Sequence, residues 1–155
     1  MAYEQAKLLD VRGNTIRVAH PTIPSQPKTY LSVAAAAGVT SLTVIDNGNL
    51  ANSEYIIIGK LGVDATEIAR INAAVTLGTA LTVTTTTYAH AVDSPVQRIL
   101  WDQAEISGST TLTGAKTVIT TMNLMADRVE TSYANTGTTY AFYFCRYKNS
   151  HTVTY

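Results

Sequence analysis

Hydrophobic and polar residues alternate in short segments through the middle of the chain, as they do in strands with one buried face. Residues 41–45 alternate, with Leu42 and Val44 on one side, and residues 79–84 alternate in the same way. Residues 55–58 are a continuous apolar run, which indicates a strand covered on both faces. Turn residues separate such segments at intervals of roughly 8–15 residues, and this spacing predicts an all-β barrel or sandwich.

Two further segments, 65–71 and 96–101, complete the strands expected in the middle of the chain. We therefore assign residues 31–107 to a small β-barrel domain. The alanines at 34–37 form one helical turn at most, because Gly38 follows them and no amphipathic stripe continues. The pattern is not an alternation of strands and helices, so a parallel sheet with a nucleotide site is not expected.

The first 30 residues have a different character. Pro21, Pro24 and Pro27 lie close together, and prolines at this density favour extended backbone and interrupt sheet ladders. We assign residues 1–30 to an extended N-terminal arm and Pro-rich linker. Within it, residues 15–18 form a candidate short strand after the turn residues Gly13 and Asn14.

Residues 108–155 are expected to form a second β unit, opened by the turn-like residues 107–110. The β-branched run 117–121 predicts a strand, whereas 122–130 has residues that favour a helix. The aromatic segment 140–147 predicts a central strand covered on both sides. The sequence ends inside a further predicted strand, 152–155. A complete seven-stranded sandwich takes about 100 residues, so we expect a partial sandwich, a sheet completed by a partner, or a domain lacking its last strands.

The charge balance excludes some classes of partner. The chain has 11 Lys and Arg and 11 Asp and Glu, and only 14% of its residues are charged. Without a basic excess to neutralise phosphates, we expect no nucleic-acid binding. We also expect no membrane span, because no apolar run reaches about 18 residues. The start of the chain lacks the basic and apolar regions of a secretory signal, and one cysteine cannot form a disulfide within the chain.

The sequence lacks the motifs of known catalytic, cofactor and metal sites. The three histidines are far apart, and residues 59–62 join two strands and do not open a helix, as a phosphate-binding loop would. Several carboxylates are of the type that glycosidases use, but we expect them to be turn and surface residues. These carboxylates are Glu54, Asp64, Glu67, Asp93, Asp102 and Glu105. The three histidines mentioned above are His20, His90 and His151. We therefore predict no catalytic residue, no cofactor and no metal.

A few single residues invite a structural interpretation. We expect His90 to be a loop histidine that forms a side-chain hydrogen bond, and Asp102 to bind turn amides at the end of a strand. Cys145 is expected to be a buried structural thiol, because it lies in an aromatic strand with no base nearby in sequence. Nine tyrosines allow a ligand-stacking face, but core packing is the preferred interpretation for an apolar strand.

The low charge also points to assembly. Threonine, at roughly one residue in six, takes the place of charged residues and suits exposed strand faces. A net charge near zero promotes association, and weakly charged strand edges pair unless neighbours cover them. A permanent place in an assembly provides this cover, and an extended arm can lie across a neighbouring subunit.

Several segments carry a resemblance to a known class of proteins. The residues EYIIIG at 54–59, ATEIARI at 65–71, YAHA at 88–91 with SPV at 94–96, and WDQAEI at 101–106 resemble the β-barrel unit of structural proteins in tailed bacteriophages. The segment YAFYFCRYKNS at 140–150 resembles a strand of the immunoglobulin-like unit that often follows. The resemblance covers about residues 31–155, and related chains continue beyond the strand that matches 152–155.

This resemblance implies an all-β virion component: an extended arm, a small β-barrel and a partial immunoglobulin-like sandwich. It implies a non-catalytic protein, assembled in the bacterial cytoplasm, that decorates the head or lies at the neck or tail. Its partners would be other virion proteins and copies of itself, and Glu67 and His90 would hold the barrel together. The alternative is a carbohydrate-binding or host-adhesion module with exposed tyrosines, and an enzyme with scattered carboxylates is a third hypothesis.

Overall fold

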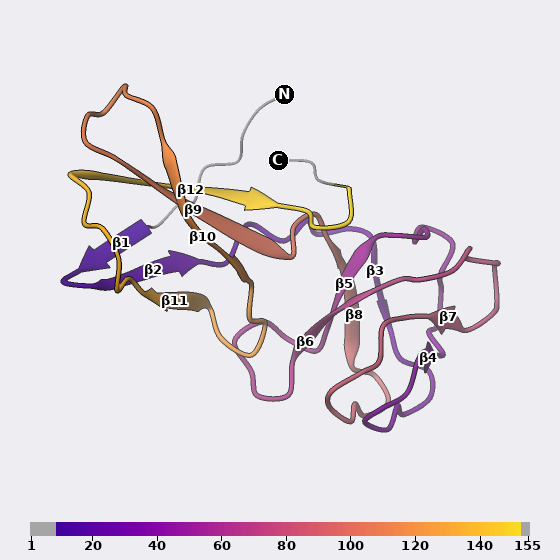
Figure 1. Ribbon diagram of the computed structural model, residues 1–155. Coiled ribbons are helices and arrows are strands. Elements are labelled where there is room, and N and C mark those ends of the chain that lie inside the picture. Colours follow the sequence, from indigo (N-terminus) through magenta and orange to yellow (C-terminus); the bar gives the residue numbers. More distant parts are fainter. Residues whose placement is uncertain (1–8, 153–155) are drawn as a thin grey trace. The chain divides into compact units, whose positions relative to one another are not determined.

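The computed structural model describes residues 9–152, and this part of the chain consists of strands and turns without a helix (Figure 1). Every pairing between its strands is antiparallel, so the all-β prediction is confirmed. The strands are β1 Leu9–Arg12, β2 Thr15–Ala19, β3 Lys28–Tyr30, β4 Ser41–Leu42, β5 Tyr55–Ile58, β6 Glu67–Arg70, β7 Leu81–Thr82, β8 Pro95–Ile99, β9 Gln103–Ser109, β10 Thr117–Asn123, β11 Glu130–Ala134 and β12 Phe142–Lys148. The helix-favouring segment 122–130 contains the end of β10, turns and the start of β11.

The chain divides into two compact units whose boundaries differ from the predicted ones. Unit 1 combines Met1–Pro21 with Trp101–Met125 and Val129–Tyr155, and unit 2 combines Thr22–Leu100 with Ala126–Arg128. The predicted boundaries after residues 30 and 107 are therefore displaced. The N-terminal segment packs with the C-terminal part of the chain, a long-range association that local patterns do not encode.

Unit 1 contains two three-stranded sheets, with strand orders β1-β2-β11 and β10-β9-β12. The turn at Gly13, which has a φ of 58°, joins β1 and β2, and β2 pairs with β11. The prediction of an extended arm is therefore wrong for residues 9–19, although the strand at 15–18 is confirmed. Ile16 and Val18 are fully buried, and this apolar face accounts for the association of β2 with unit 1.

The central strand of the second sheet is β9, which includes residues 107–109 of the segment that was predicted from the sequence to be turn-like. Ser107, Gly108 and Ser109 are all buried in this strand. Gly108 packs against Tyr140, and a Cβ atom at residue 108 would lie 2.2 Å from a carbon of the Tyr140 ring. Small residues here permit close packing of an aromatic ring, and they do not mark a turn.

The aromatic segment forms β12, which pairs with β9 over its whole length. The prediction that this strand is covered on both faces is wrong, because Phe142 is exposed and only Cys145 and Tyr147 are buried. The Tyr147 hydroxyl donates to the Ala19 carbonyl at 2.7 Å and so links β12 to the other sheet of unit 1. Of the predicted strand 152–155, residue 152 lies in a turn and 153–155 fall outside the described residues.

Unit 2 contains a four-stranded sheet, β3-β8-β5-β6, and a two-stranded sheet, β4-β7. Neither sheet closes into a barrel, so the barrel prediction is not confirmed. Single bridges connect the two sheets at both ends: Leu31 pairs with Val44 beyond β3, and Ile71 pairs with Val83 beyond β6. The strands of unit 2 thus form a ring of neighbours, two of whose links are single bridges.

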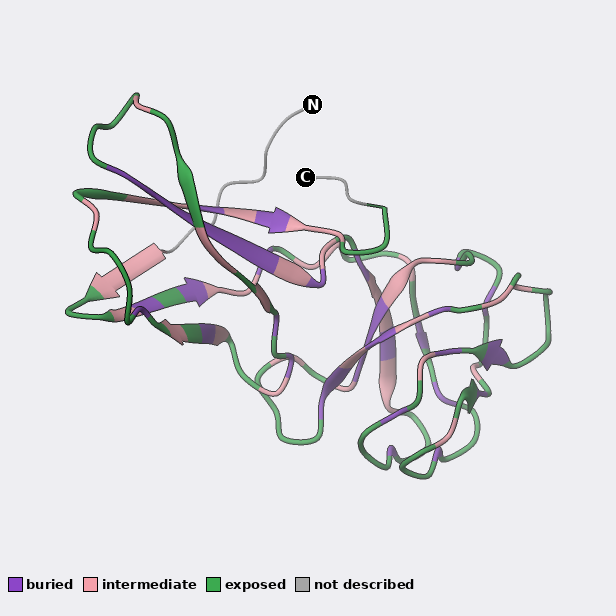
Figure 2. Ribbon diagram, viewed as in Figure 1, coloured by how far each residue is buried: buried purple, intermediate pink, exposed green. Residues whose placement is uncertain are grey.

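The core of unit 2 is made of aliphatic side chains from both sheets and from the bridges. Strand β5 is buried over three of its four residues, and β8 contributes the buried Val96 and Ile99 (Figure 2). The buried cluster contains Leu31, Ala35, Leu42, Leu50, Ile56, Ile58, Ala69, Ile71, Leu81, Val83 and Val96. On the other side of β5, Ile57 packs with Ile99 and Ala126. This arrangement confirms the prediction that residues 55–58 form a strand covered on both faces.

Candidate functional site

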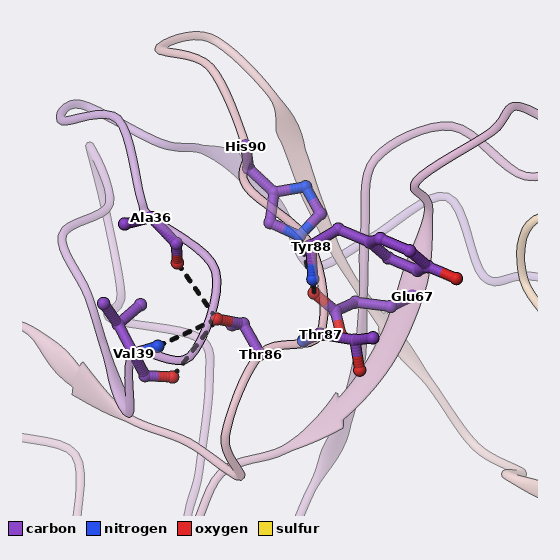
Figure 3. Close-up of polar contacts among 7 residues, drawn as sticks. All are labelled: Ala36, Val39, Glu67, Thr86, Thr87, Tyr88 and His90. Atoms are coloured by element: carbon purple, nitrogen blue, oxygen red, sulfur yellow. Dashed lines mark hydrogen bonds and ion pairs between the residues drawn. The ribbon is translucent and has the colours of Figure 1, made fainter.

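A group of buried polar side chains is centred on Glu67, the first residue of β6. Glu67 and His90 are both buried, and His90 Nε2 lies 2.8 Å from Glu67 Oε1 (Figure 3). The same carboxylate accepts hydrogen bonds from the backbone N–H of Thr87 at 2.7 Å and of Tyr88 at 3.1 Å. Three donors therefore converge on one buried carboxylate, which satisfies an acceptor that would otherwise be costly to bury.

A second polar anchor, Thr86, lies next to this group in the same loop. Its hydroxyl accepts from the Val39 N–H at 3.1 Å and donates to the Ala36 carbonyl at 3.1 Å (Figure 3). The backbones of Ala35 and His90 form an antiparallel bridge. Residues 86–90 are thereby tied to both β6 and the loop 35–39. Sequence reasoning did not single out Thr86, because it is one of four consecutive threonines and only its burial distinguishes it.

This geometry supports a structural task for Glu67 and His90. A carboxylate–imidazole pair can act in proton transfer when a substrate reaches it. Here the exposed fractions of the two side chains are 4% for His90 and 9% for Glu67, and the carboxylate is occupied by donors from its own loop. The predicted loop hydrogen bond of His90 is confirmed, and the prediction of a surface position for Glu67 is wrong. The resemblance implied that both residues hold this unit together, and their contact agrees with that role.

The other candidate carboxylates contact different partners and do not gather. Asp102 accepts from the Ser150 N–H at 2.8 Å and from its hydroxyl at 2.5 Å, which confirms the predicted turn contact. Glu105 is buried in β9, so its predicted surface position is wrong as well, and Arg146 Nε binds it at 2.7 Å. Glu54 is bound by Arg98 at 3.0 Å. Asp64 and Asp93 are exposed.

The remaining histidines and the cysteine lie apart from one another. Burial lowers the pKa of His20, and a hydrogen bond to the Pro21 carbonyl opposes this shift in part. His151 is exposed, in a turn. Burial raises the pKa of Cys145 to about 12, and the charge of Glu105 adds to the rise. Cys145 is buried, as predicted. Residues 9–152 contain no group of three or more His, Cys, Asp or Glu placed to hold a metal ion, and no helix long and apolar enough to cross a membrane.

Unit 1 has an open groove of about 780 Å³ along the sheet β10-β9-β12. The Lys116 ammonium lies over the Phe144 ring, 4.1 Å from its centre, and Arg146 is paired with Glu105. The cationic groups of the groove thus already have internal partners. The residues that line it are Leu9, Glu105, Ser107, Leu112, Lys116, Val118, Tyr143, Phe144, Cys145 and Arg146.

Unit 2 also contains a turn that is held by hydrogen bonds to a buried side chain. The buried side chain of Asn47 donates to the carbonyls of Thr76 at 2.9 Å and Thr79 at 2.8 Å, and its oxygen accepts from the Gly78 N–H. Leu77, at the tip of this turn, is 75% exposed. The sequence predicted a turn at residues 46–49, but the role of Asn47 in a second turn depends on the tertiary structure.

Comparison with protein-family models gave no match for this chain, and comparison with curated protein sequences gave none either. The fold and the contacts within it therefore carry the functional argument.

Proposed function

We propose that this chain is a non-catalytic structural protein of a tailed-bacteriophage virion. It decorates the head and reinforces contacts between capsid subunits, with the neck or tail as the second placement. Its partners are capsid proteins or neck and tail proteins, together with further copies of itself. The β-rich surfaces of the two units supply the contacts.

One observation carries the assembly role: large apolar side chains are held out to solvent on rigid turns and strands. Leu77 is the clearest case, because the Asn47 side chain donates two hydrogen bonds to the turn that presents Leu77 and accepts a third from it. Ile45, two residues before Asn47, is 64% exposed. A fixed turn loses little conformational entropy when a partner covers it, so exposed apolar residues there suit permanent contact.

The buried polar groups support a non-catalytic role, because they form contacts within the fold. Glu67, His90 and Asp102 are used inside the fold, where each holds a loop in place. The net charge of zero removes long-range repulsion between copies and between the chain and its neighbours.

We also propose that the finer architecture follows the resemblance. In unit 2 the two bridges would make the ring of strands a small, interrupted barrel around the aliphatic core. In unit 1 the two three-stranded sheets would correspond to a partial immunoglobulin-like sandwich, with β1 and β2 supplied by the N-terminal segment.

The test is the composition of purified particles of the phage that encodes this chain. We expect the protein to sediment with intact particles at a fixed copy number and to give density with the symmetry of the capsid in electron micrographs. A double variant, Ile45→Ser with Leu77→Ser, is expected to bind particles that lack the protein less tightly than the wild type does. The matched control is Val63→Ser with Val92→Ser, at exposed positions of the same unit. Absence of the protein from purified particles would overturn the proposal.

The alternative, a carbohydrate-binding module, requires tyrosine rings with open faces. Among the described tyrosines, only Tyr30 and Tyr88 are exposed, and the Lys28 ammonium lies 5.3 Å from the centre of the Tyr30 ring. Tyr140 and Tyr143 pack edge to face against each other. Glycan binding that is lost on Tyr30→Ala or Tyr88→Ala would favour this alternative.

A further inference from the structure

From the edge strand β10, we infer that the protein forms a two-fold dimer in which β10 pairs antiparallel with β10 of a second copy. This inference rests on the assembly role proposed above and names a surface and a partner for it. The dimer would join two three-stranded sheets into one sheet of six strands.

The position of β10 in its sheet is the first observation. In the order β10-β9-β12, β10 pairs with β9 on one side, and no described strand lies on its other side. Its seven residues are exposed or half-buried. Such an edge presents a row of backbone N–H and C=O groups that a further strand can pair with.

The composition of β10 is the second observation. Residues 117–123 read Thr-Val-Ile-Thr-Thr-Met-Asn, with no charge and no proline and with five β-branched residues. Charged side chains and prolines are the usual protection of an exposed edge, and β-branched residues favour pairing. β10 is therefore an edge without chemical protection along its length.

The other outer strands of unit 1 differ in this respect. β1 has four residues and carries Asp10 and Arg12, which form an ion pair at 3.0 Å. β11 begins at Glu130, and β12 carries Arg146 and Lys148. β10 is thus the one outer strand of the described part of unit 1 that lacks a charged residue, so the lack of protection is local to it.

A bulge locates the part of β10 that is best suited to pairing. The register to β9 shifts between Val118 and Thr120, whereas Thr120–Asn123 pair regularly with Gln103–Ile106. A bulge twists an edge away from new partners, so we assign the contact to the regular part. Thr121 lies within it and is exposed. We place the two-fold axis at Thr121, so that this residue faces its own symmetry mate.

The lack of charged residues on β10 favours a second copy of β10 as the strand that pairs with this edge. An antiparallel pair of identical strands places residues near the strand centre opposite their own symmetry mates, so a charge there would repel itself. β10 has none, and the whole chain has a net charge of zero. Among the described edge strands longer than two residues, β10 is the one without a charged residue, so a second copy of β10 offers a partner strand that is equally unprotected.

The experiment uses charge at residue 121. Sedimentation of the full chain from about 1 to 200 µM is expected to show a monomer–dimer equilibrium for the wild type. Thr121→Lys and Thr121→Glu are each expected to weaken the dimer by about tenfold or more, because like charges then meet across the two-fold axis. Thr138→Lys, at an exposed loop position of the same unit, is the control and should dimerise like the wild type.

An equal mixture of the Thr121→Lys and Thr121→Glu proteins is expected to dimerise at least as tightly as the wild type, because opposite charges then meet. Recovery in the mixture also establishes that both variants are folded. A wild type that is monomeric throughout, or a mixture no tighter than either variant alone, would overturn the inference. A monomer that is present in purified particles overturns the dimer and leaves the virion role standing; a dimer that is absent from particles does the reverse.

Discussion

The ring of Tyr140 packs directly against the backbone of Gly108, a buried residue near the C-terminal end of the central strand β9. A Cβ atom at residue 108 would lie 2.2 Å from Tyr140 Cδ2 and 2.3 Å from Cγ, inside any allowed contact distance. The Tyr140 ring is itself held by an edge-to-face contact with Tyr143, at 6.3 Å between ring centres. The ring therefore has little freedom to move away.

This contact predicts that Gly108→Ala lowers the free energy of unfolding by about 1–3 kcal/mol, the usual cost of overpacking. Gly137→Ala is the control, because its nearest neighbour would lie at an ordinary 3.6 Å. Urea unfolding followed by circular dichroism measures both. The double variant Gly108→Ala with Tyr140→Ala should lose less than the sum of the single losses, because removal of the ring removes the clash. Additive losses would contradict the assigned contact.

The buried carboxylate of Glu67 leads to a second prediction. Glu67→Gln replaces one acceptor oxygen by an N–H donor and places it among three donors, so we expect unfolding free energy to fall by about 1–3 kcal/mol. Asp64→Asn, at an exposed position before the same strand, should change it by less than about 0.5 kcal/mol. Chemical denaturation of both proteins at neutral pH gives the comparison. Equal stabilities for the two variants would refute a structural role for the Glu67–His90 pair.

The Cys145 thiol, with its pKa raised to about 12, provides a third prediction. The thiolate is the reactive form of cysteine. At pH 8, the rate at which a disulfide reagent modifies Cys145 should therefore be at least about tenfold lower in the native protein than in denaturant. A Thr138→Cys variant provides an exposed thiol in the same unit for comparison. Native Cys145 that reacts as fast as the thiol at residue 138 would show that the site is open to solvent.

The lowered pKa of His20 predicts a pH dependence of stability. Because the folded state binds a proton less readily than the unfolded state, whose His pKa is near 6.5, stability should fall as pH drops below about 6.5. Above that pH both states are neutral at this residue and its titration contributes nothing. His20→Gln should lose this component, so its pH profile should fall less steeply than that of the wild type between about pH 7 and 5. Parallel profiles over that range would count against the burial of a neutral His20.

Local sequence patterns predicted the class of fold and several strands. The apolar run at 55–58 forms β5, the alternating segments at 41–45 and 79–84 contain β4 and β7, and the β-branched run at 117–121 lies in β10. These segments were recognisable because a strand buries alternate residues or both faces whatever its partner is. The loop role of His90 and the turn contact of Asp102 were also accessible, since both residues stand beside turn signals in the sequence.

Other features depended on contacts between distant residues, and short-range patterns do not encode such contacts. Gly108 resembles a turn residue in the sequence, but in the structure Tyr140 packs against it. The segment before the proline-rich residues forms a hairpin whose partner strand, β11, lies more than a hundred residues away. The sequence by itself therefore determined that this protein is built from short antiparallel strands with few charges. Only the tertiary structure decided which strands share a sheet, that Glu67 meets His90, and which edge remains open, because each of these is set by pairing across the fold.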